Sequence, residues 1–141
     1  MKLLIKKFTH LFVLWVLTTL PVFAQLSPGD LAIVGYNSDA MPDEMAIVAL
    51  APINSGQTVY ISDFGWTGSS FYSSVADGAI EWSVTSTVPA GTILRFTLSD
   101  LGVSGDLYNY GSVIFNPWSS SFSPVTSGGD NWFIYQGPNY L

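Results

Sequence analysis

The 141-residue chain contains no cysteine and very little positive charge. It has four Lys and Arg residues against ten Asp and Glu residues, and His10 is its single histidine. Three of the four basic residues, Lys2, Lys6 and Lys7, precede His10 in the sequence. Arg95 is therefore the only basic residue after His10. Without cysteine the fold has no disulfides and no lipid anchor on an N-terminal cysteine, and its stability must come from its core.

These absences exclude several classes of function. A nucleic-acid-binding protein needs Lys and Arg to displace phosphate counterions, and ten carboxylates beside one arginine repel a phosphate backbone. Ser-His-Asp and Cys-His catalysis need an imidazole, and zinc sites usually use Cys and His. Three options remain, namely chemistry carried by carboxylates, binding of calcium, and a function without chemistry. We therefore expect no nucleic-acid partner.

The first 24 residues have the pattern of a secretory signal peptide. Lysines near the N-terminus precede the apolar run 11–20, and Ala24 provides a small side chain before a cleavage point at Gln25. The apolar run is shorter than the roughly 20 residues that span a bilayer, which favours a cleaved signal over a membrane anchor. We expect a secreted or cell-surface protein that meets the membrane only through its export signal. Residues 25–141 are then a single domain.

Short apolar or alternating segments, separated by turn residues, predict an all-β fold. The continuous run DLAIVGY at 30–36 predicts a strand that is buried on both faces, and 64–78 is predicted to be a long loop. In AIEWSVT, alternation predicts that Ile80, Trp82 and Val84 face the core. The predicted strands are 30–36, 44–50, 58–62, 79–85, 92–98, 113–115 and 131–136.

Two segments thirty-five positions apart share one pattern. INSGQTVYIS begins at Ile53 and VPAGTILRFTL begins at Val88. Each has an apolar residue, two turn residues, a glycine and then alternating apolar positions. Two interpretations are open, because the pattern suits two equivalent turn-strand units in the fold and also suits any common hairpin start.

Several short strands with regular turn signals predict an immunoglobulin-like antiparallel β-sandwich. The order of SDFGW at 62–66, PAGT at 89–92 and SGGD at 127–130 resembles the lamin-tail-like, immunoglobulin-type modules of secreted bacterial proteins. The opening at 29–37 is similar to the first strand of such modules in Bacteroidetes-type surface proteins. The resemblance covers most of residues 28–137 and implies an accessory domain beside hydrolase or sorting domains. Because the chain stops just past a predicted strand, it also implies a truncated sandwich that lacks its last edge strand.

Aromatic side chains in Ser-, Gly- and Asn-rich loops are the main candidates for a binding site. They are Trp66 and Tyr72 in the predicted long loop, Tyr108 and Tyr110 in YNYG, and Trp118 in NPWS. Such rings offer a large contact area at low entropic cost beside small polar neighbours, which suits a carbohydrate or a cell-surface protein. The same rings would also close the open ends of a sandwich, since aromatic residues are mostly buried.

Carboxylates are the candidates for a metal site. Asp39, Asp43 and Glu44 cluster around a proline-containing stretch, and calcium is bound by such oxygens. The alternative is a solvated acidic loop. No cofactor other than calcium is expected. Asp63 is expected to accept hydrogen bonds from the turn that follows it.

The sequence therefore predicts a non-catalytic extracellular β-sandwich module for binding or adhesion. Two alternatives remain open. One is a carboxylate- or calcium-dependent hydrolase domain, for which Glu81 would need a second carboxylate facing it at a defined separation. The other is a truncated fragment without an independent function. The oligomeric state is left open.

Overall fold

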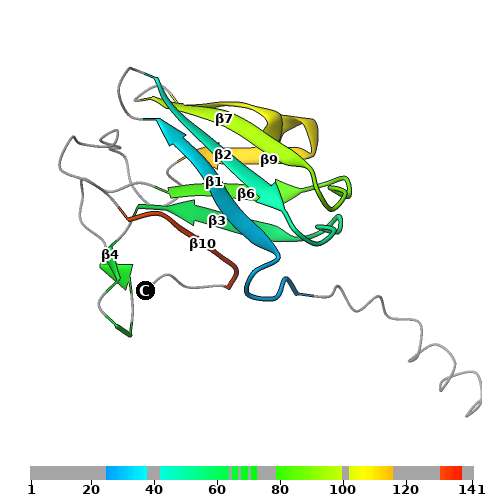
Figure 1. The fold of residues 1–141 in the computed structure, drawn as a ribbon, viewed down its shortest axis with the longest axis horizontal. Helices are drawn as coiled ribbons and strands as arrows, with labels where there is room; N and C mark the ends of the chain where they lie inside the picture. The colour runs from blue at the N-terminus through cyan, green and yellow to red at the C-terminus, as the bar shows by residue number, and fades with distance from the viewer. Residues whose placement is uncertain are drawn as a thin grey trace, which may run out of the picture.

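The chain folds into two four-stranded antiparallel sheets, which the computed structural model places face to face (Figure 1). The predicted signal peptide, Asp39 and Trp118 lie outside the residues that the structure describes. The prediction of an antiparallel all-β sandwich is confirmed. The described residues are 25–37, 42–63, 65–66, 68–69, 71–72, 79–99, 102–115 and 131–137.

The elements run through the two sheets in the following order. The first sheet has the order β1-β2-β7-β8, with bounds β1 (Leu31–Asn37), β2 (Asp43–Ala49), β7 (Ile93–Ser99) and β8 (Gly102–Gly105). The second sheet has the order β10-β3-β6-β9, with bounds β10 (Phe133–Tyr135), β3 (Thr58–Ser62), β6 (Ala79–Val84) and β9 (Gly111–Phe115). A small hairpin consists of β4 (Gly65–Trp66) and β5 (Phe71–Tyr72), and a 3-10 helix, η1 (Asp106–Asn109), links β8 to β9. Among the described residues, no helix is long and apolar enough to cross a membrane.

The core lies between the two sheets and contains the residues that alternation predicts. Ile80, Trp82 and Val84 are all buried, as expected. The indole N–H of Trp82 donates a hydrogen bond to the backbone oxygen of Leu107 at 3.0 Å, so that the buried polar group of this large ring is satisfied. Because Leu107 belongs to η1 and is itself fully buried, this bond holds η1 against the sandwich on the side of β8 and β9.

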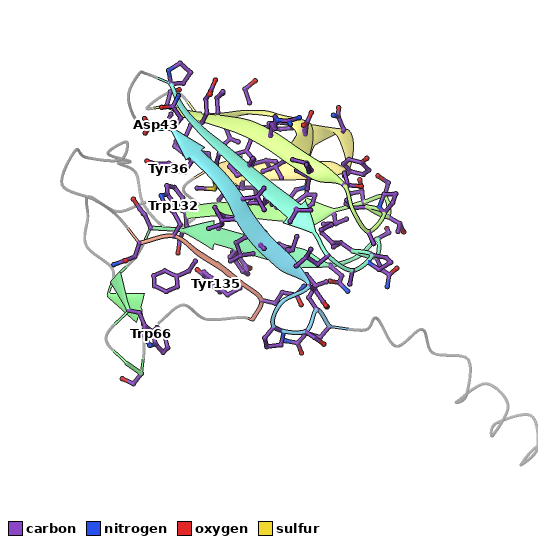
Figure 2. All side chains as sticks on the ribbon, viewed as in Figure 1. Tyr36, Asp43, Trp66, Trp132 and Tyr135 are labelled. Atoms are coloured by element: carbon purple, nitrogen blue, oxygen red, sulfur yellow. The ribbon has the colours of Figure 1, made fainter. Side chains whose placement is uncertain are left out.

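The opposite side of the sandwich lies between β1 and β10. There Tyr36 packs against Trp132, which precedes β10, with ring centroids 6.0 Å apart and an angle of 49° between the rings (Figure 2). Tyr36 is 40% exposed, because only one neighbouring strand covers it. This aromatic contact links the two sheets at their edges.

The prediction that the first strand is buried on both faces is wrong. β1 is the edge strand of the first sheet, and Ile33 and Val34 are 37% and 56% exposed. Its register with β2 also shifts between Ile33 and Gly35, as in a β-bulge. A continuous apolar run does not distinguish a central strand from an edge strand, since both have the same local pattern.

Other predicted strands agree closely with the structure. The segment 58–62 coincides with β3, the prediction for β6 is one residue too long at its end, and the predictions for β2 and β7 are each shifted by one residue. β10 has three residues instead of the predicted six. The predictions missed β8, whose sequence GVSG has no run of apolar side chains, and they missed the short strands β4 and β5 within the predicted loop.

The repeated pattern corresponds to two equivalent crossovers between the sheets. β2 leads through Ile53 into β3 of the second sheet, and β6 leads through Val88 into β7 of the first sheet. The two crossovers run side by side and pair with each other. Ile53 N–H donates to the oxygen of Val88 at 3.0 Å, and Val88 N–H donates to the oxygen of Ile53 at 2.9 Å. The interpretation as two equivalent units is therefore correct.

The turns after this bridge are also equivalent. Gly56 and Gly91 have φ angles of 91° and 83°, which residues with a side chain rarely adopt. Gly56 N–H donates to the oxygen of Val84 at 2.8 Å, and Gly91 N–H donates to the oxygen of Ala49 at 2.7 Å. The turn before β3 is thus bonded to the last residue of β6, its neighbour in the second sheet. The turn before β7 is bonded to the last residue of β2, its neighbour in the first sheet.

We expect Ile53→Ala to lower the free energy of unfolding by about 2–5 kcal/mol, because it leaves a cavity where the two crossovers meet. Ile53 is fully buried. Urea denaturation followed by tryptophan fluorescence would measure the loss. The matched control is Ile93→Ala on β7, where the side chain is 45% exposed, with an expected loss below about 1 kcal/mol. Equal losses in the two variants would contradict a special role for the crossover.

Candidate functional site

A row of large side chains crosses the outer face of the second sheet. In β3, Val59 and Ile61 are buried in the core, so Tyr60 between them projects outward. The register pairs Tyr60 with Tyr135 of β10 on one side and with Glu81 of β6 on the other. Directly paired residues on neighbouring strands project from the same face. β10, β3 and β6 therefore bring two tyrosines and a carboxylate together.

The two tyrosine rings are stacked. The ring centroids of Tyr60 and Tyr135 are 5.4 Å apart, and the rings are inclined by 24°. Both side chains are half-buried. Such pairs contribute about 0.5–1.5 kcal/mol beyond the area that they bury. The stack therefore holds both rings in place.

Glu81 and burial both act on the Tyr60 phenol. Burial raises the pKa of Tyr60 above its ordinary value of 10.0, and the negative charge of Glu81 raises this pKa further. Both causes disfavour the phenolate. The Tyr60 hydroxyl is therefore a neutral hydrogen-bond donor and acceptor at every physiological pH.

Hydroxyl groups form a second row beside the first. The register pairs Thr58 with Ser83 and Ser83 with Ser112, two positions along the strands from Tyr60 and Glu81. Thr58 and Ser83 are half-buried, and Ser112 is exposed. Each hydroxyl has one hydrogen to donate and two lone pairs that accept. An aromatic row and a hydroxyl row thus lie side by side on this outer face.

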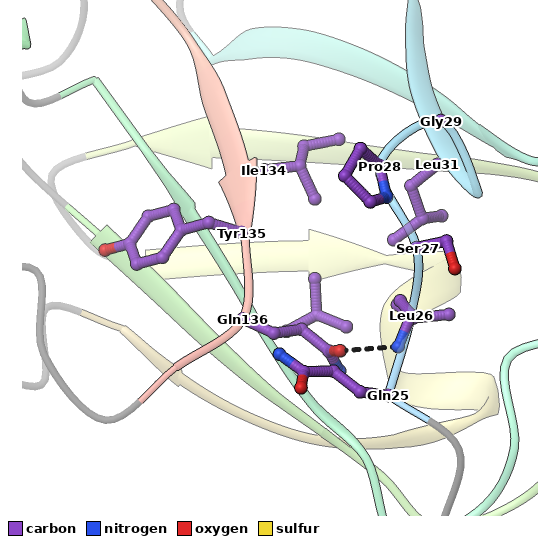
Figure 3. Close-up of a pocket in the computed structure, with 10 residues that line it drawn as sticks. Gln25, Leu26, Ser27, Pro28, Gly29, Leu31, Ile134, Tyr135 and Gln136 are labelled. Carbon is purple, nitrogen blue, oxygen red and sulfur yellow. Dashed lines mark hydrogen bonds between the residues drawn. The ribbon is translucent and has the colours of Figure 1, made fainter.

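A pocket of about 310 Å³ lies next to β10, between this strand and the segment 25–31 (Figure 3). Ile134 points toward Leu31, whereas the Tyr135 ring points the opposite way, because consecutive residues of a strand face opposite sides (Figure 3). Apolar side chains of the segment, β3 and β10 line the pocket, and glutamine side chains add polar groups. Its apolar residues include Leu26, Leu31, Val59 and Ile134.

Gln136 ties the segment beside this pocket to the second sheet. Its Oε1 accepts a hydrogen bond from the Leu26 N–H at 2.8 Å (Figure 3). Its Nε2 donates to Gln57 Oε1 and to the Thr58 oxygen, both at 3.1 Å. One side chain therefore connects the N-terminal segment, β10 and the start of β3. The residue that follows Tyr135 is thus held by three hydrogen bonds.

The loop aromatics that the sequence singled out lie on different elements. Trp66 on β4 and Tyr108 on η1 are each 51% exposed. Figure 1 shows β4 and η1 at opposite ends of the molecule, so these two rings do not form one surface. Tyr110 is half-buried and packs against the core. Tyr72 lies on β5, where the structure does not describe its side chain, and Trp118 lies outside the described residues.

Two of the three predicted metal ligands lie at the start of β2. Asp43 is 1% exposed and Glu44 is exposed, because consecutive strand residues point to opposite faces. Asp39 lies outside the described residues. Within the described part of the chain, no group of three or more His, Cys, Asp or Glu residues is placed to hold a metal ion. Calcium binding stays a prediction.

Asp63 follows β3 directly and is buried, with 8% of its surface exposed. A hydrolytic pair that includes Glu81 needs a second carboxylate opposite it. Its directly opposite residues are Tyr60 on β3 and Ile114 on β9, and neither carries a second carboxylate. Glu81 therefore lies beside an aromatic ring and an aliphatic chain on its two neighbouring strands.

The tyrosine pair was missed from the sequence. Alternation in TVYIS places Tyr60 on the polar face of its strand, and this was the available signal. Tyr135 belongs to a strand that lies 75 positions later in the chain, and nothing local reveals that β10 pairs with β3. Cross-strand partners this far apart are decided by the fold.

The chain was compared with known proteins. No protein-family model, no curated protein and no solved structure matches it. The outer face of the second sheet is therefore interpreted from its own chemistry. It combines two stacked rings, one carboxylate and three hydroxyls, which suits a ligand that has both apolar and hydroxyl-bearing surfaces.

We expect Glu81→Gln to lower the pKa of Tyr60, because it removes the negative charge while burial remains. The pKa should stay above 10.0, since burial is the larger cause. Ultraviolet titration of tyrosinate, with the Tyr60→Phe variant subtracted, measures this one group. The pKa of Tyr60 is higher in the folded state than the ordinary value of 10.0, so this group stabilises the folded protein below pH 10.0. This stability is lost as the pH rises through the folded-state pKa. An unchanged titration curve in Glu81→Gln would show that this carboxylate does not act on the phenol.

Proposed function

We propose that this protein is a non-catalytic extracellular module that binds carbohydrate on the outer face of its second sheet. The observation that carries this proposal is the stacked pair Tyr60 and Tyr135, with Glu81 beside it in the same cross-strand row. The resemblance to lamin-tail-like modules supports an accessory role in an exported or cell-surface protein. The signal-peptide pattern supports export.

Carbohydrates suit this face because a sugar ring has apolar C–H surfaces and hydroxyls around its rim. The tyrosine rings would contact the apolar surface of a sugar, since large rigid aromatic groups provide contact area at low entropic cost. Glu81 would accept hydrogen bonds from sugar hydroxyls, and bonds to a charged acceptor are the stronger kind. Thr58, Ser83 and Ser112 would supply donors and acceptors at the edge of the site.

Preorganisation supports the same proposal. The Tyr60 and Tyr135 rings pack against each other, so little side-chain freedom would be lost on binding. Gln136 further restrains β10 next to Tyr135 through bonds to Leu26 and Thr58. A site that is ordered before the ligand arrives binds more tightly than one that must be ordered by it.

A second candidate function is binding of a cell-surface protein through loop aromatics. Trp66 and Tyr108, each 51% exposed, favour it, because exposed Trp and Tyr rings are typical anchors of protein interfaces. β4 and η1, which carry these residues, lie at opposite ends of the molecule, so one small ligand would not contact both rings (Figure 1). Trp66→Ala and Tyr108→Ala test this candidate separately.

We expect Tyr135→Ala to weaken binding to soluble oligosaccharides and polysaccharides about tenfold or more, because it removes one of two stacked rings. Affinity electrophoresis against a panel of neutral glycans would identify a ligand, and titration calorimetry would measure the change. Tyr135→Phe is the matched control, since it keeps the ring and should bind within a factor of about three. Melting curves would show that the variants remain folded.

Two results would count against this site. One is unchanged glycan affinity in both Tyr60→Ala and Tyr135→Ala. The other is loss of binding only in Trp66→Ala, which would move the site to the β4–β5 hairpin. Failure to bind any glycan of the panel would contradict the carbohydrate proposal itself.

A further inference from the structure

The outer face of the first sheet carries a groove of about 400 Å³ that the proposed glycan site does not use. The groove lies on the opposite side of the sandwich from Tyr60, because the two sheets bury their inner faces against each other. All four strands of the first sheet contribute residues to it. They include Gly35, Asn37, Glu44, Ala46, Arg95 and Ser104.

Small residues form one row of this groove. The register pairs Gly35 with Ala46, and Ala46 with Arg95. A Cβ built at Gly35 would lie 3.5 Å from the Cβ of Ala46, so the absence of one side chain and the shortness of the next leave room beside Arg95. Arg95 is exposed and rises next to these two small residues.

Polar side chains form the neighbouring row. Cross-strand pairing joins Asn37 to Glu44, Glu44 to Thr97, and Thr97 to Ser104, so one polar side chain comes from each of the four strands. They supply a carboxamide, a carboxylate and two hydroxyls. The groove therefore has hydrogen-bonding groups along its length and a single positive charge, on Arg95.

The only hydrogen bond of Arg95 to a side chain among the described residues is made by its backbone. Within the part of the chain that the structure describes, the guanidinium makes no ion pair and no hydrogen bond. The bond that Arg95 does make uses its backbone N–H, which donates to Asp106 Oδ2 at 2.9 Å. Asp106 Oδ1 accepts from the Asn109 side chain at 3.3 Å, so this carboxylate is engaged with η1. Arg95 is also the only Lys, Arg or His after His10 in a chain with ten carboxylates.

We propose that this groove is a second binding site, specific for a sugar acid whose carboxylate pairs with Arg95. A guanidinium binds a carboxylate through two parallel hydrogen bonds, a geometry that a single neutral group does not reproduce. The carboxamide, hydroxyl and Glu44 groups of the polar row bind the hydroxyls of the same sugar. A ligand with one carboxylate and several hydroxyls uses every polar group of the groove.

The acidic surroundings restrict the ligand further. Ten carboxylates in the chain repel a polyanion, so a single acidic sugar, or one at the end of a neutral glycan, binds better than a long polyuronate. The carboxylate of Glu44 repels any second carboxylate of the ligand that comes close to it, since like charges at short range are destabilising. The site thus selects one negative charge per ligand.

The test is calorimetric or NMR titration of residues 25–141 with D-galacturonate, with D-galactose as the uncharged match. We expect galacturonate to bind at least about tenfold more tightly than galactose, and R95Q to remove this difference. R95K should retain part of it, because lysine keeps the charge but loses the two-pronged geometry. Arg95 is exposed, so both variants should keep the melting temperature of the unaltered protein.

Two further variants separate charge from shape. Ala46→Leu fills the groove without changing any charge and should weaken galacturonate binding about as much as R95Q. E44Q should weaken the binding of galacturonate and of galactose by a similar factor, because Glu44 accepts hydrogen bonds from hydroxyls that both sugars carry, and the ratio between the two affinities should stay as in the unaltered protein. The neutral-glycan affinity should be unchanged in R95Q, so this site and the tyrosine site can fail independently.

Four results would overturn the proposal. The first is equal binding of galacturonate and galactose, and the second is an R95Q variant that still distinguishes them. The third is that free alanine binds more tightly than galacturonate and that the E44Q variant no longer binds alanine. The ligand would then be an amino-acid zwitterion held between Glu44 and Arg95. A small acidic peptide that outcompetes galacturonate would likewise replace the sugar acid by a protein ligand.

Discussion

The structure depends on the bridge between Ile53 and Val88, where two chain segments cross between the sheets side by side. Because the crossovers are paired, β2 and β7 must be neighbours in one sheet when β3 and β6 are neighbours in the other. Gly56 and Gly91 allow both segments to turn immediately afterwards with positive φ angles. The four central strands are thereby fixed relative to each other, and the edge strands add to this frame.

Both candidate binding faces are consequences of these four central strands. Tyr60 lies opposite Glu81 because β3 pairs with β6, and Ala46 lies opposite Arg95 because β2 pairs with β7. The inner faces bury the apolar residues, which leaves the outer faces for ligands. One outer face is aromatic and the other carries the single arginine of the domain, so the two differ in the chemistry that they can recognise.

Much of the fold followed from local patterns, and the candidate sites did not. Alternation located β3 and β6 almost to the residue, because a strand with one buried face must alternate. The apolar run at 30–36 located β1 to within one residue but did not reveal that β1 is an edge strand, and β8, which has no apolar run, was missed. For the sites, the sequence directed attention to loop rings such as Trp66 and Tyr108, since loops commonly carry function. The clustered side chains instead come from strands, where polar-face residues look ordinary until their neighbours are known.

The sequence by itself determined the acidic character of the chain, the absence of imidazole and thiol chemistry after His10, the all-β class and the inward or outward direction of most strand residues. These properties depend on composition and on contacts between residues close in the chain. Only the tertiary structure decided which strands lie at an edge, that Tyr135 stacks on Tyr60, and that the guanidinium of Arg95 stands over a groove beside Gly35. Those properties depend on pairing between strands that are distant in the sequence. The alternation of side chains along a strand has a period of two residues whichever strand pairs with it, so it does not identify the partner.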